Sequence, residues 1–185
     1  MLLALSVNSE ESITSFLFYL MQYSITNLNA FFVLLAFGYV MRKGREVSFI
    51  SQLKGQFQAN PVLGLSLALC LFSMAGIPPL VGFFAKYRVL YSAIENGYYF
   101  LAIVGILASV VSAAYYLRVI RVIHFDASGP EREEQASMGG EKTVLVSSTH
   151  SFIIAVLTLF ILLFIVSPSL LLNSSNLLAL SLFSA

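Results

Sequence analysis

The chain has 185 residues, of which 58% are hydrophobic and 10% are charged, and its formal net charge is +1. With a mean hydropathy of +0.88, this composition indicates an integral membrane protein and gives no reason to expect a nucleic-acid partner. The single cysteine, Cys70, rules out an internal disulfide and a cysteine-based metal cluster, and His124 and His150 lie too far apart in sequence to suggest a metal site. The sequence contains no nucleophile elbow, phosphate loop or dinucleotide fingerprint, which excludes a soluble catalytic site of these kinds.

Residues 13–41 are predicted to form the first membrane span. They are largely apolar and free of proline, and a helix of this length, at about 1.5 Å per residue, crosses about 30 Å of hydrocarbon. One face of this helix is polar, because hydrophilic side chains recur at helical spacing: Tyr19, Gln22, Tyr23, Thr26 and Asn29. In lipid such a face must meet protein or water. Two interpretations stay open, namely hydrogen bonds to neighbouring helices or a wet path.

The second span, residues 60–94, is interrupted. Five residues predict a break in its helix: Gly76, Ile77, Pro78, Pro79 and Gly82. Backbone groups freed at such a break need partners in protein or in a water-filled cavity, because lipid offers none. Lys86 follows a few residues later, and a buried ammonium in a bilayer is costly, so the combination marks a candidate functional site. The alternative is a surface turn between two short helices, with Lys86 extending to the lipid headgroups.

The remaining spans are predicted at residues 98–122 and 147–167, after a turn at 95–97. Span 98–122 carries small residues that let a neighbouring helix approach closely: Gly105, Ser109, Ser112 and Ala113. Polar loops are predicted at 42–59 and 123–145, where charged residues, glycine and proline gather.

The positions of the basic residues indicate how the interrupted segment crosses. Eight of the ten Lys and Arg residues lie in 42–54 and 118–142, whereas Glu10, Glu11 and Glu95 lie in connections without Lys or Arg. Both basic loops share one side only if residues 60–94 cross once, as the positive-inside rule favours. We therefore predict an all-α integral membrane protein, a single membrane region over residues 1–185, with about four transmembrane helices. One of these helices is discontinuous at Gly76–Gly82.

The segment from Leu69 to Lys86, LCLFSMAGIPPLVGFFAK, resembles the broken-helix signature of the antiporter-like, proton-pumping subunits of respiratory complex I and of cation/proton antiporters. Flanking segments at 18–20 (FYL), 29–31 (NAF) and 112–118 (SAAYYLR) are similar to the subunit 2 family of NADH:ubiquinone oxidoreductase. The resemblance covers nearly the whole chain. The glycine-proline break with its lysine is specific to the superfamily rather than to that subunit.

The resemblance implies an inverted-repeat fold in which the carboxyl-terminal discontinuous helix holds a lysine that transfers protons, and Lys86 matches that lysine. An ammonium in a low-dielectric site can exchange protons near neutral pH, whereas one in water cannot. The sequence offers no acid within the hydrophobic part of any span, so a permanent ion pair of Lys86 inside the chain is not expected. The candidate polar neighbours of a proton path carry hydroxyl groups: Ser73, Tyr19, Tyr23, Thr26, Ser112, Tyr115 and Tyr116.

The function that the resemblance implies is that of a membrane-arm subunit of an H⁺-translocating NADH:ubiquinone reductase, in which NADH oxidation and quinone reduction drive proton translocation. This chain is expected to have no redox site, cofactor or metal of its own, with flavin and iron–sulfur clusters in other subunits. Two alternatives remain: a cation/proton antiporter subunit, or a purely structural membrane subunit of a respiratory complex.

The resemblance covers only the carboxyl-terminal portion of the family's chain. Either another chain supplies the amino-terminal repeat or the sequence is an incomplete product. The expected partners are other membrane-arm subunits, the chain with the missing repeat, and lipids. The expected location is the mitochondrial inner membrane, with a bacterial or other energy-transducing membrane as the alternative.

Overall fold

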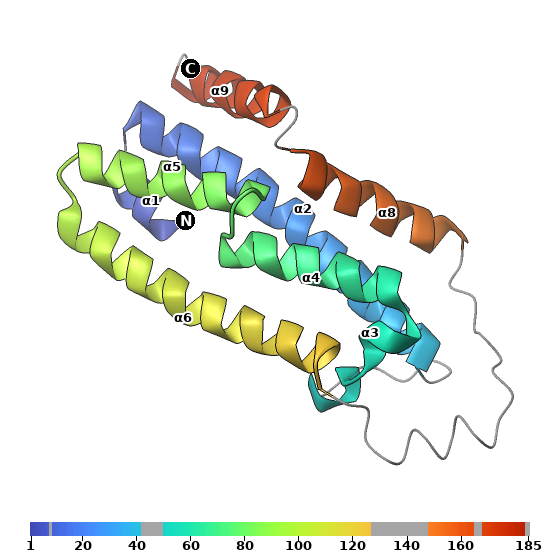
Figure 1. Ribbon diagram of the computed structural model, residues 1–185. Coiled ribbons are helices and arrows are strands. Elements are labelled where there is room, and N and C mark those ends of the chain that lie inside the picture. The colour runs from blue at the N-terminus through green and yellow to red at the C-terminus, as the bar shows by residue number, and fades with distance from the viewer. Residues whose placement is uncertain (8, 42–49, 127–147, 165–167, 184–185) are drawn as a thin grey trace, which may run out of the picture.

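The computed structural model describes residues 1–7, 9–41, 50–126, 148–164 and 168–183, and within these ranges it contains helices and no strand (Figure 1). The helices are α1 (Leu2–Val7), α2 (Glu10–Met41), the short 3-10 helix η1 (Ile50–Leu53), α3 (Gln56–Ala59), α4 (Pro61–Ala75), α5 (Val81–Glu95), α6 (Tyr99–His124), α8 (Ser148–Leu163) and α9 (Ser169–Phe183). The predicted all-α class is confirmed for this part of the chain.

Two of the described helices are long and apolar enough to cross a membrane on their own. They are α2 over Glu10–Val40, with a mean hydropathy of 1.4, and α6 over Tyr99–His124, with 2.1. Helices α4 and α8 are apolar but shorter. The 15 residues of α4 and the 15 of α5 each extend only about 22 Å, less than the roughly 30 Å of hydrocarbon. Neither half therefore crosses alone, and the number of crossings stays a prediction.

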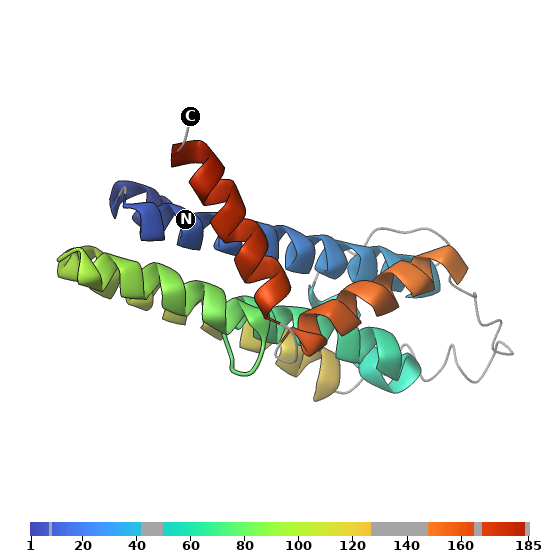
Figure 2. The same cartoon turned by 90° about the horizontal axis from the view of Figure 1, so that it is seen from above.

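Helices α4 and α5 are two halves of one discontinuous helix. They run in the same direction and follow one another along the elongated bundle, and α6 returns in the opposite direction (Figures 1 and 2). This common direction is compatible with the single crossing that the positions of the basic residues favoured, which itself stays a prediction. A hairpin between two full spans would instead have reversed the chain at the break.

Helix α2 is the element against which most of the others pack, since it contacts α4, α5, α8 and α9. The main hydrophobic core lies between these helices and α6, and its large, fully buried side chains include Phe18, Phe37, Leu67, Ile123 and Ile161. Because α2 contacts both α4 and α5, it bridges the interruption between them and supports the two ends that meet there.

The segment 50–59 is structured, although the sequence predicted it as part of a polar loop. Leu53 is buried, and the ring of Phe57 packs against that of His124 with centroids 4.5 Å apart. Lys54 lies 3.7 Å from Asp126 at the end of α6. Apolar anchors within the loop therefore hold η1 and α3 against α6. The rest of the two predicted loops, 42–49 and 127–145, and residues 147 and 165–167 of the fourth predicted span lie outside the described residues.

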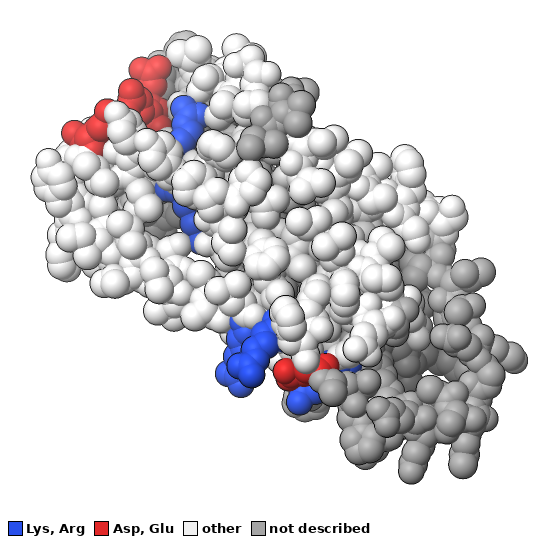
Figure 3. Space-filling model, viewed as in Figure 1, with Lys and Arg blue, Asp and Glu red and all other residues white. Residues whose placement is uncertain are grey.

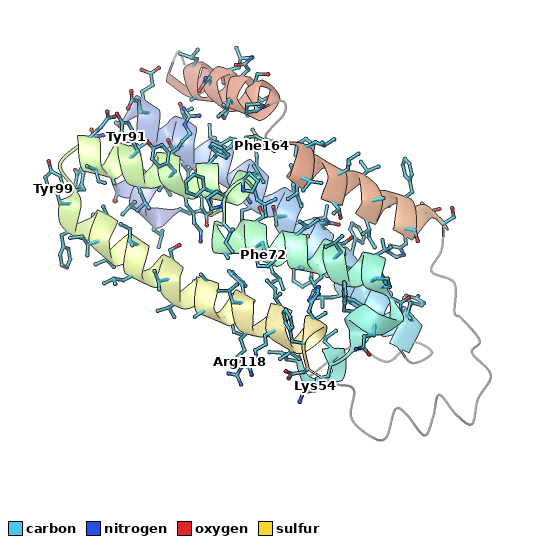
Figure 4. The ribbon with its side chains drawn as sticks, in the orientation of Figure 1. Lys54, Phe72, Tyr91, Tyr99, Arg118 and Phe164 are labelled. Atoms are coloured by element: carbon cyan, nitrogen blue, oxygen red, sulfur yellow. The ribbon has the colours of Figure 1, made fainter. Side chains whose placement is uncertain are left out.

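Charged side chains gather at the two ends of the bundle. Figure 3 shows Asp and Glu at the end where α2 begins and α5 ends, a mainly basic group where α6 ends, and a largely uncharged surface between them. In Figure 4, Tyr91 and Tyr99 lie near the first end and Lys54 and Arg118 near the second. A surface with few charges between two charged ends is typical of a protein surrounded by lipid.

Candidate functional site

The carboxyl-terminal end of α4 is formed by Gly76. Its φ of 86° is left-handed, a conformation that glycine adopts at little cost. The Gly76 N–H donates to the carbonyl of Ser73 at 3.0 Å, and the Ile77 N–H donates to that of Phe72 at 3.1 Å. These two bonds form a Schellman motif, which satisfies two of the last carbonyls of the helix. Phe72 lies about midway between the two ends of the bundle in Figure 4, so the interruption lies near the middle of the length of the bundle.

The interruption itself covers residues 76–80, because α5 begins at Val81. Gly82, which the sequence assigned to the break, lies in the first turn of α5. Its backbone N–H donates to the Ser73 hydroxyl at 3.2 Å, and a Cβ at this position would overlap the Ser73 carbonyl. The glycine therefore allows the start of α5 to approach the last turn of α4, where Ser73 binds one of the free N–H groups of α5.

Lys86 on α5 forms a second contact across the interruption, from α5 back to α4. Its ammonium donates to the carbonyl of Ala75, the last residue of α4, at 2.9 Å and to the hydroxyl of Ser109 on α6 at 2.8 Å. The end of a helix carries free carbonyls and a partial negative charge, which favour a cation. Each half-helix thus supplies a side chain that binds the free backbone groups of the other: Ser73 from α4 and Lys86 from α5.

Among the residues that the structure describes, no Asp or Glu forms a salt bridge with Lys86. Its side chain is partly buried, and its two hydrogen bonds go to neutral oxygens. Arg88, two residues further on, lines a different cavity of about 410 Å³ between α5 and the α8–α9 region. The two cations of α5 therefore belong to different environments.

A cavity of about 690 Å³ lies beside Lys86 and is lined by α1, α2, α4, α5 and α6. Most of its lining is apolar. The polar side chains that line it are Ser6, Tyr19, Gln22, Tyr23, Ser73, Lys86, Ser109, Ser112 and Tyr116. The cavity thus collects hydroxyl groups from α1, α2, α4 and α6 beside the amine of Lys86.

Most of the candidate path residues line this cavity with Lys86, namely Tyr19, Tyr23, Ser73, Ser112 and Tyr116. Two do not. Thr26 is fully buried and accepts a hydrogen bond from the Gln22 side chain at 3.1 Å. Tyr115 lines a smaller cavity of about 250 Å³, which shares Met74 and Tyr116 with the larger one. Thr26 is connected to the larger cavity only through Gln22, which lines it.

The polar face of α2 has both of the roles that its sequence left open. Tyr19, Gln22 and Tyr23 line the cavity. Further along, the amide of Asn29 donates to Cys70 Sγ at 3.2 Å and to Thr158 Oγ1 at 3.0 Å, which links α2 to α4 and α8. The first part of the face therefore borders open space, and the second part joins helices.

Ser109 is the contact residue that the sequence analysis missed, because it was treated only as a small packing residue. The sequence nonetheless contained a signal for the contact between Ser109 and Lys86. Lys86 lies 11 residues before Gly97 in the turn and Ser109 lies 12 residues after it. In a helical hairpin such nearly equal separations place two residues opposite one another. Leu90 and Gly105 follow the same rule and are also neighbours.

Within the part of the chain that the structure describes, no three His, Cys, Asp or Glu side chains are placed to hold a metal ion. The chemistry available at the site is that of an amine among hydroxyl and carbonyl oxygens. Such a group can bind and release a proton.

Comparison with known proteins gives one family match, described as NADH:quinone oxidoreductase/Mrp antiporter, TM, over residues 1–112. NADH-ubiquinone oxidoreductase chain 2 of Rhizopus oryzae is 54% identical over 99% of this chain. NADH-quinone oxidoreductase subunit N of Pelagibacter ubique is 40% identical over 93%. The chain spans only 39% and 34% of the lengths of these two relatives.

Solved structures with a similar fold include the following two. A chain of the Mrp complex from Dietzia sp. DQ12-45-1b matches with a TM-score of 0.74 at 19% identity, over 95% of this chain and 39% of that chain. A chain of respiratory complex I from Thermus thermophilus with bound aureothin matches with a TM-score of 0.64 at 21% identity, over 89% of this chain and 36% of that one.

Proposed function

Because the chain belongs to the NADH:quinone oxidoreductase/Mrp antiporter family of membrane subunits, we propose that it works as the carboxyl-terminal part of subunit 2 of a proton-translocating NADH:ubiquinone oxidoreductase. The identities of 54% and 40% to chain 2 and subunit N favour this enzyme over a cation/proton antiporter, since the Mrp likeness is one of fold. The chain would act as a subunit of the enzyme and contain no redox site.

Lys86 is the residue that we propose to take up and release the proton. The observation that carries this role is its hydrogen bonding: its ammonium is held by a backbone carbonyl and a hydroxyl, with no described carboxylate in contact. A fixed carboxylate would stabilise the charged form and hinder release, whereas neutral oxygens leave both protonation states accessible. The position of Lys86 beside a cavity supplies room for proton donors and acceptors to reach the amine.

Hydroxyl groups along the cavity are the proposed neighbours that exchange the proton with Lys86. Tyr19, Tyr23, Ser112 and Tyr116 each carry an O–H that can donate and accept. Thr26 and Tyr115, which do not line this cavity, are assigned to the surroundings of the path rather than to the amine itself. Oxidation of NADH and reduction of ubiquinone would take place in other subunits, which would also hold the flavin and the iron–sulfur clusters.

A second chain is the proposed partner on the open side of α6. This helix exposes a row of residues that includes Ile103, Leu107, Val111 and Ser112, and the cavity at Lys86 is lined on one side by the same helix. The relatives are longer than this chain, which spans 39% and 34% of their lengths, so they contain protein that this chain lacks. We propose that a chain with the amino-terminal repeat, together with other membrane-arm subunits and lipids, covers this face. The proposed location is the mitochondrial inner membrane.

Replacement of Lys86 by methionine in the assembled complex tests the function. Methionine keeps the length and apolar stem of the side chain but cannot carry a proton, so Lys86→Met is expected to lose proton pumping driven by NADH. Arg88→Met is the matched control, because it removes a cation from the same helix at a residue that lines another cavity. The control is expected to pump at the wild-type rate.

Complex assembly is measured alongside pumping, so that a loss of protein is not mistaken for a loss of function. If assembled Lys86→Met pumped as fast as wild type, Lys86 would not be a proton carrier and the chain would be a structural subunit. Proton flux that depends on a cation and does not require NADH would instead assign the chain to an antiporter.

A further inference from the structure

We propose that Ser109 is a positioning residue that holds Lys86 in one place in both of its protonation states. The inference rests on the proposed role of Lys86 as the proton carrier. It adds that Ser109 allows Lys86 to release its proton while the Lys86 side chain stays in place. It follows from the hydrogen bonds that the two residues share and from the different capacities of a hydroxyl and a carbonyl.

The charged side chain of Lys86 has three N–H donors and no acceptor, so it needs acceptors only. The Ala75 carbonyl and the Ser109 hydroxyl supply two of them, at 2.9 and 2.8 Å. Once the proton has left, the neutral amine has two donors and one lone pair. The Ala75 carbonyl can still accept, but it cannot serve the lone pair, because it has no hydrogen to donate.

The Ser109 hydroxyl can serve either form. It accepts from the ammonium, and rotation about its C–O bond lets it donate to the lone pair of the amine. Neither change requires Lys86 to move, so the Ala75 contact, and with it the junction of α4 and α5, persists. Removal of the hydroxyl would leave the ammonium with one acceptor fewer and the lone pair without this donor.

The packing of α5 on α6 holds Ser109 at the required distance. One turn away, Gly105 lies against Leu90, where an added Cβ would meet the leucine side chain at 3.5 Å, an ordinary contact distance. The stem of Lys86 lies over Gly76, which limits its own movement. The other titratable groups that line the cavity are Tyr19 and Tyr23 from α2, Tyr116 from α6 and the amino group of Met1 from the start of the chain.

The test compares Ser109→Ala with Ser109→Thr in the assembled, energised complex. Ser109→Ala is expected to lower the rate of NADH-driven proton pumping by about tenfold or more, since about tenfold is the lower end of the range that corresponds to the loss of one hydrogen bond to a charged group. Ser109→Thr keeps the hydroxyl and is expected to retain most of the rate. The pH profile of pumping is expected to change shape in Ser109→Ala and to stay as in wild type in Ser109→Thr.

Ser92→Ala is the matched control. Ser92 is buried in α5 and its hydroxyl donates to the carbonyl of Val89 in its own helix, so its loss is expected to leave both rate and pH profile unchanged. Ser109→Cys is a second variant in case Ser109→Ala does not assemble, since it keeps the volume with a weaker donor. It is expected to be impaired as well.

A wild-type rate and pH profile in assembled Ser109→Ala or Ser109→Cys would overturn the inference, as would equal losses in Ser109→Ala and Ser92→Ala. Failure of the proposed function looks different, because Lys86→Met would then pump normally. If Lys86→Met were inactive and Ser109→Ala normal, Lys86 would remain the carrier and Ser109 alone would be excluded.

Discussion

Gly82 on α5 lies so close to the carbonyl of Ser73 on α4 that a Cβ at position 82 would overlap the carbonyl oxygen. In the same contact the Gly82 N–H donates to the Ser73 hydroxyl. The discontinuous helix therefore depends on one position without a side chain, at which the two halves meet through their backbones.

Gly82→Ala is expected to destabilise the junction of α4 and α5 by about 1–3 kcal/mol, the usual range for an atom forced into a closely packed site. The opposing atom is a backbone carbonyl, which cannot rotate away. The melting temperature and yield of the assembled complex measure the effect. Gly105→Ala is the control, because its Cβ would find ordinary contacts at 3.5 Å and beyond. Equal behaviour of the two variants would contradict the close contact at Gly82.

Gly76→Ala is expected to lower both stability, through backbone strain, and the rate of proton pumping, through displacement of Lys86. A left-handed residue with a side chain is destabilised by about 1–2 kcal/mol, and here the new Cβ would also lie 2.9 Å from Cδ of Lys86. The displaced stem would disturb the bond from Lys86 to Ala75. Gly97→Ala shares the left-handed backbone, with a φ of 80°, but its Cβ would meet nothing within 4 Å.

The rate of pumping per assembled complex separates these two variants. Gly97→Ala is expected to lose some stability and keep its rate, and Gly76→Ala to lose both. A wild-type rate of pumping in assembled Gly76→Ala would show that proton pumping does not depend on the position of the Lys86 stem.

Asn29 and Thr158 are expected to be energetically coupled, because the Asn29 amide donates to the Thr158 hydroxyl between α2 and α8. A double-mutant cycle of Asn29→Ala and Thr158→Val should give a coupling of about 0.5–1.5 kcal/mol, the net value of a typical intramolecular hydrogen bond. Thermal stability of the complex is the measurement. Thr14→Val is the control, since the Thr14 hydroxyl donates to the backbone carbonyl of Glu10 within α2, and the effect of Thr14→Val on stability should simply add to that of Asn29→Ala.

The polar face of α2 shows how far a periodic pattern can be interpreted. Its spacing predicted correctly that the side chains share one side of the helix, which follows from helical geometry alone. It could not separate Tyr19 and Gln22, which line the cavity, from Asn29, which binds α4 and α8. That division depends on where the neighbouring helices are packed, and the spacing of residues within α2 carries no such information.

The sequence by itself determined the helical class and the place where the second span is interrupted. Both depend on local properties: long apolar runs without proline form helices, and Gly76 with Pro78 and Pro79 ends one. Only the tertiary structure decided what Lys86 contacts. Ser109 lies 23 residues away on an antiparallel helix, and its meeting with Lys86 requires the turn at Gly97, the contact of Gly105 with Leu90 and the end of α4 to be placed together. Such a contact is a property of the packed helices, because no single segment contains it.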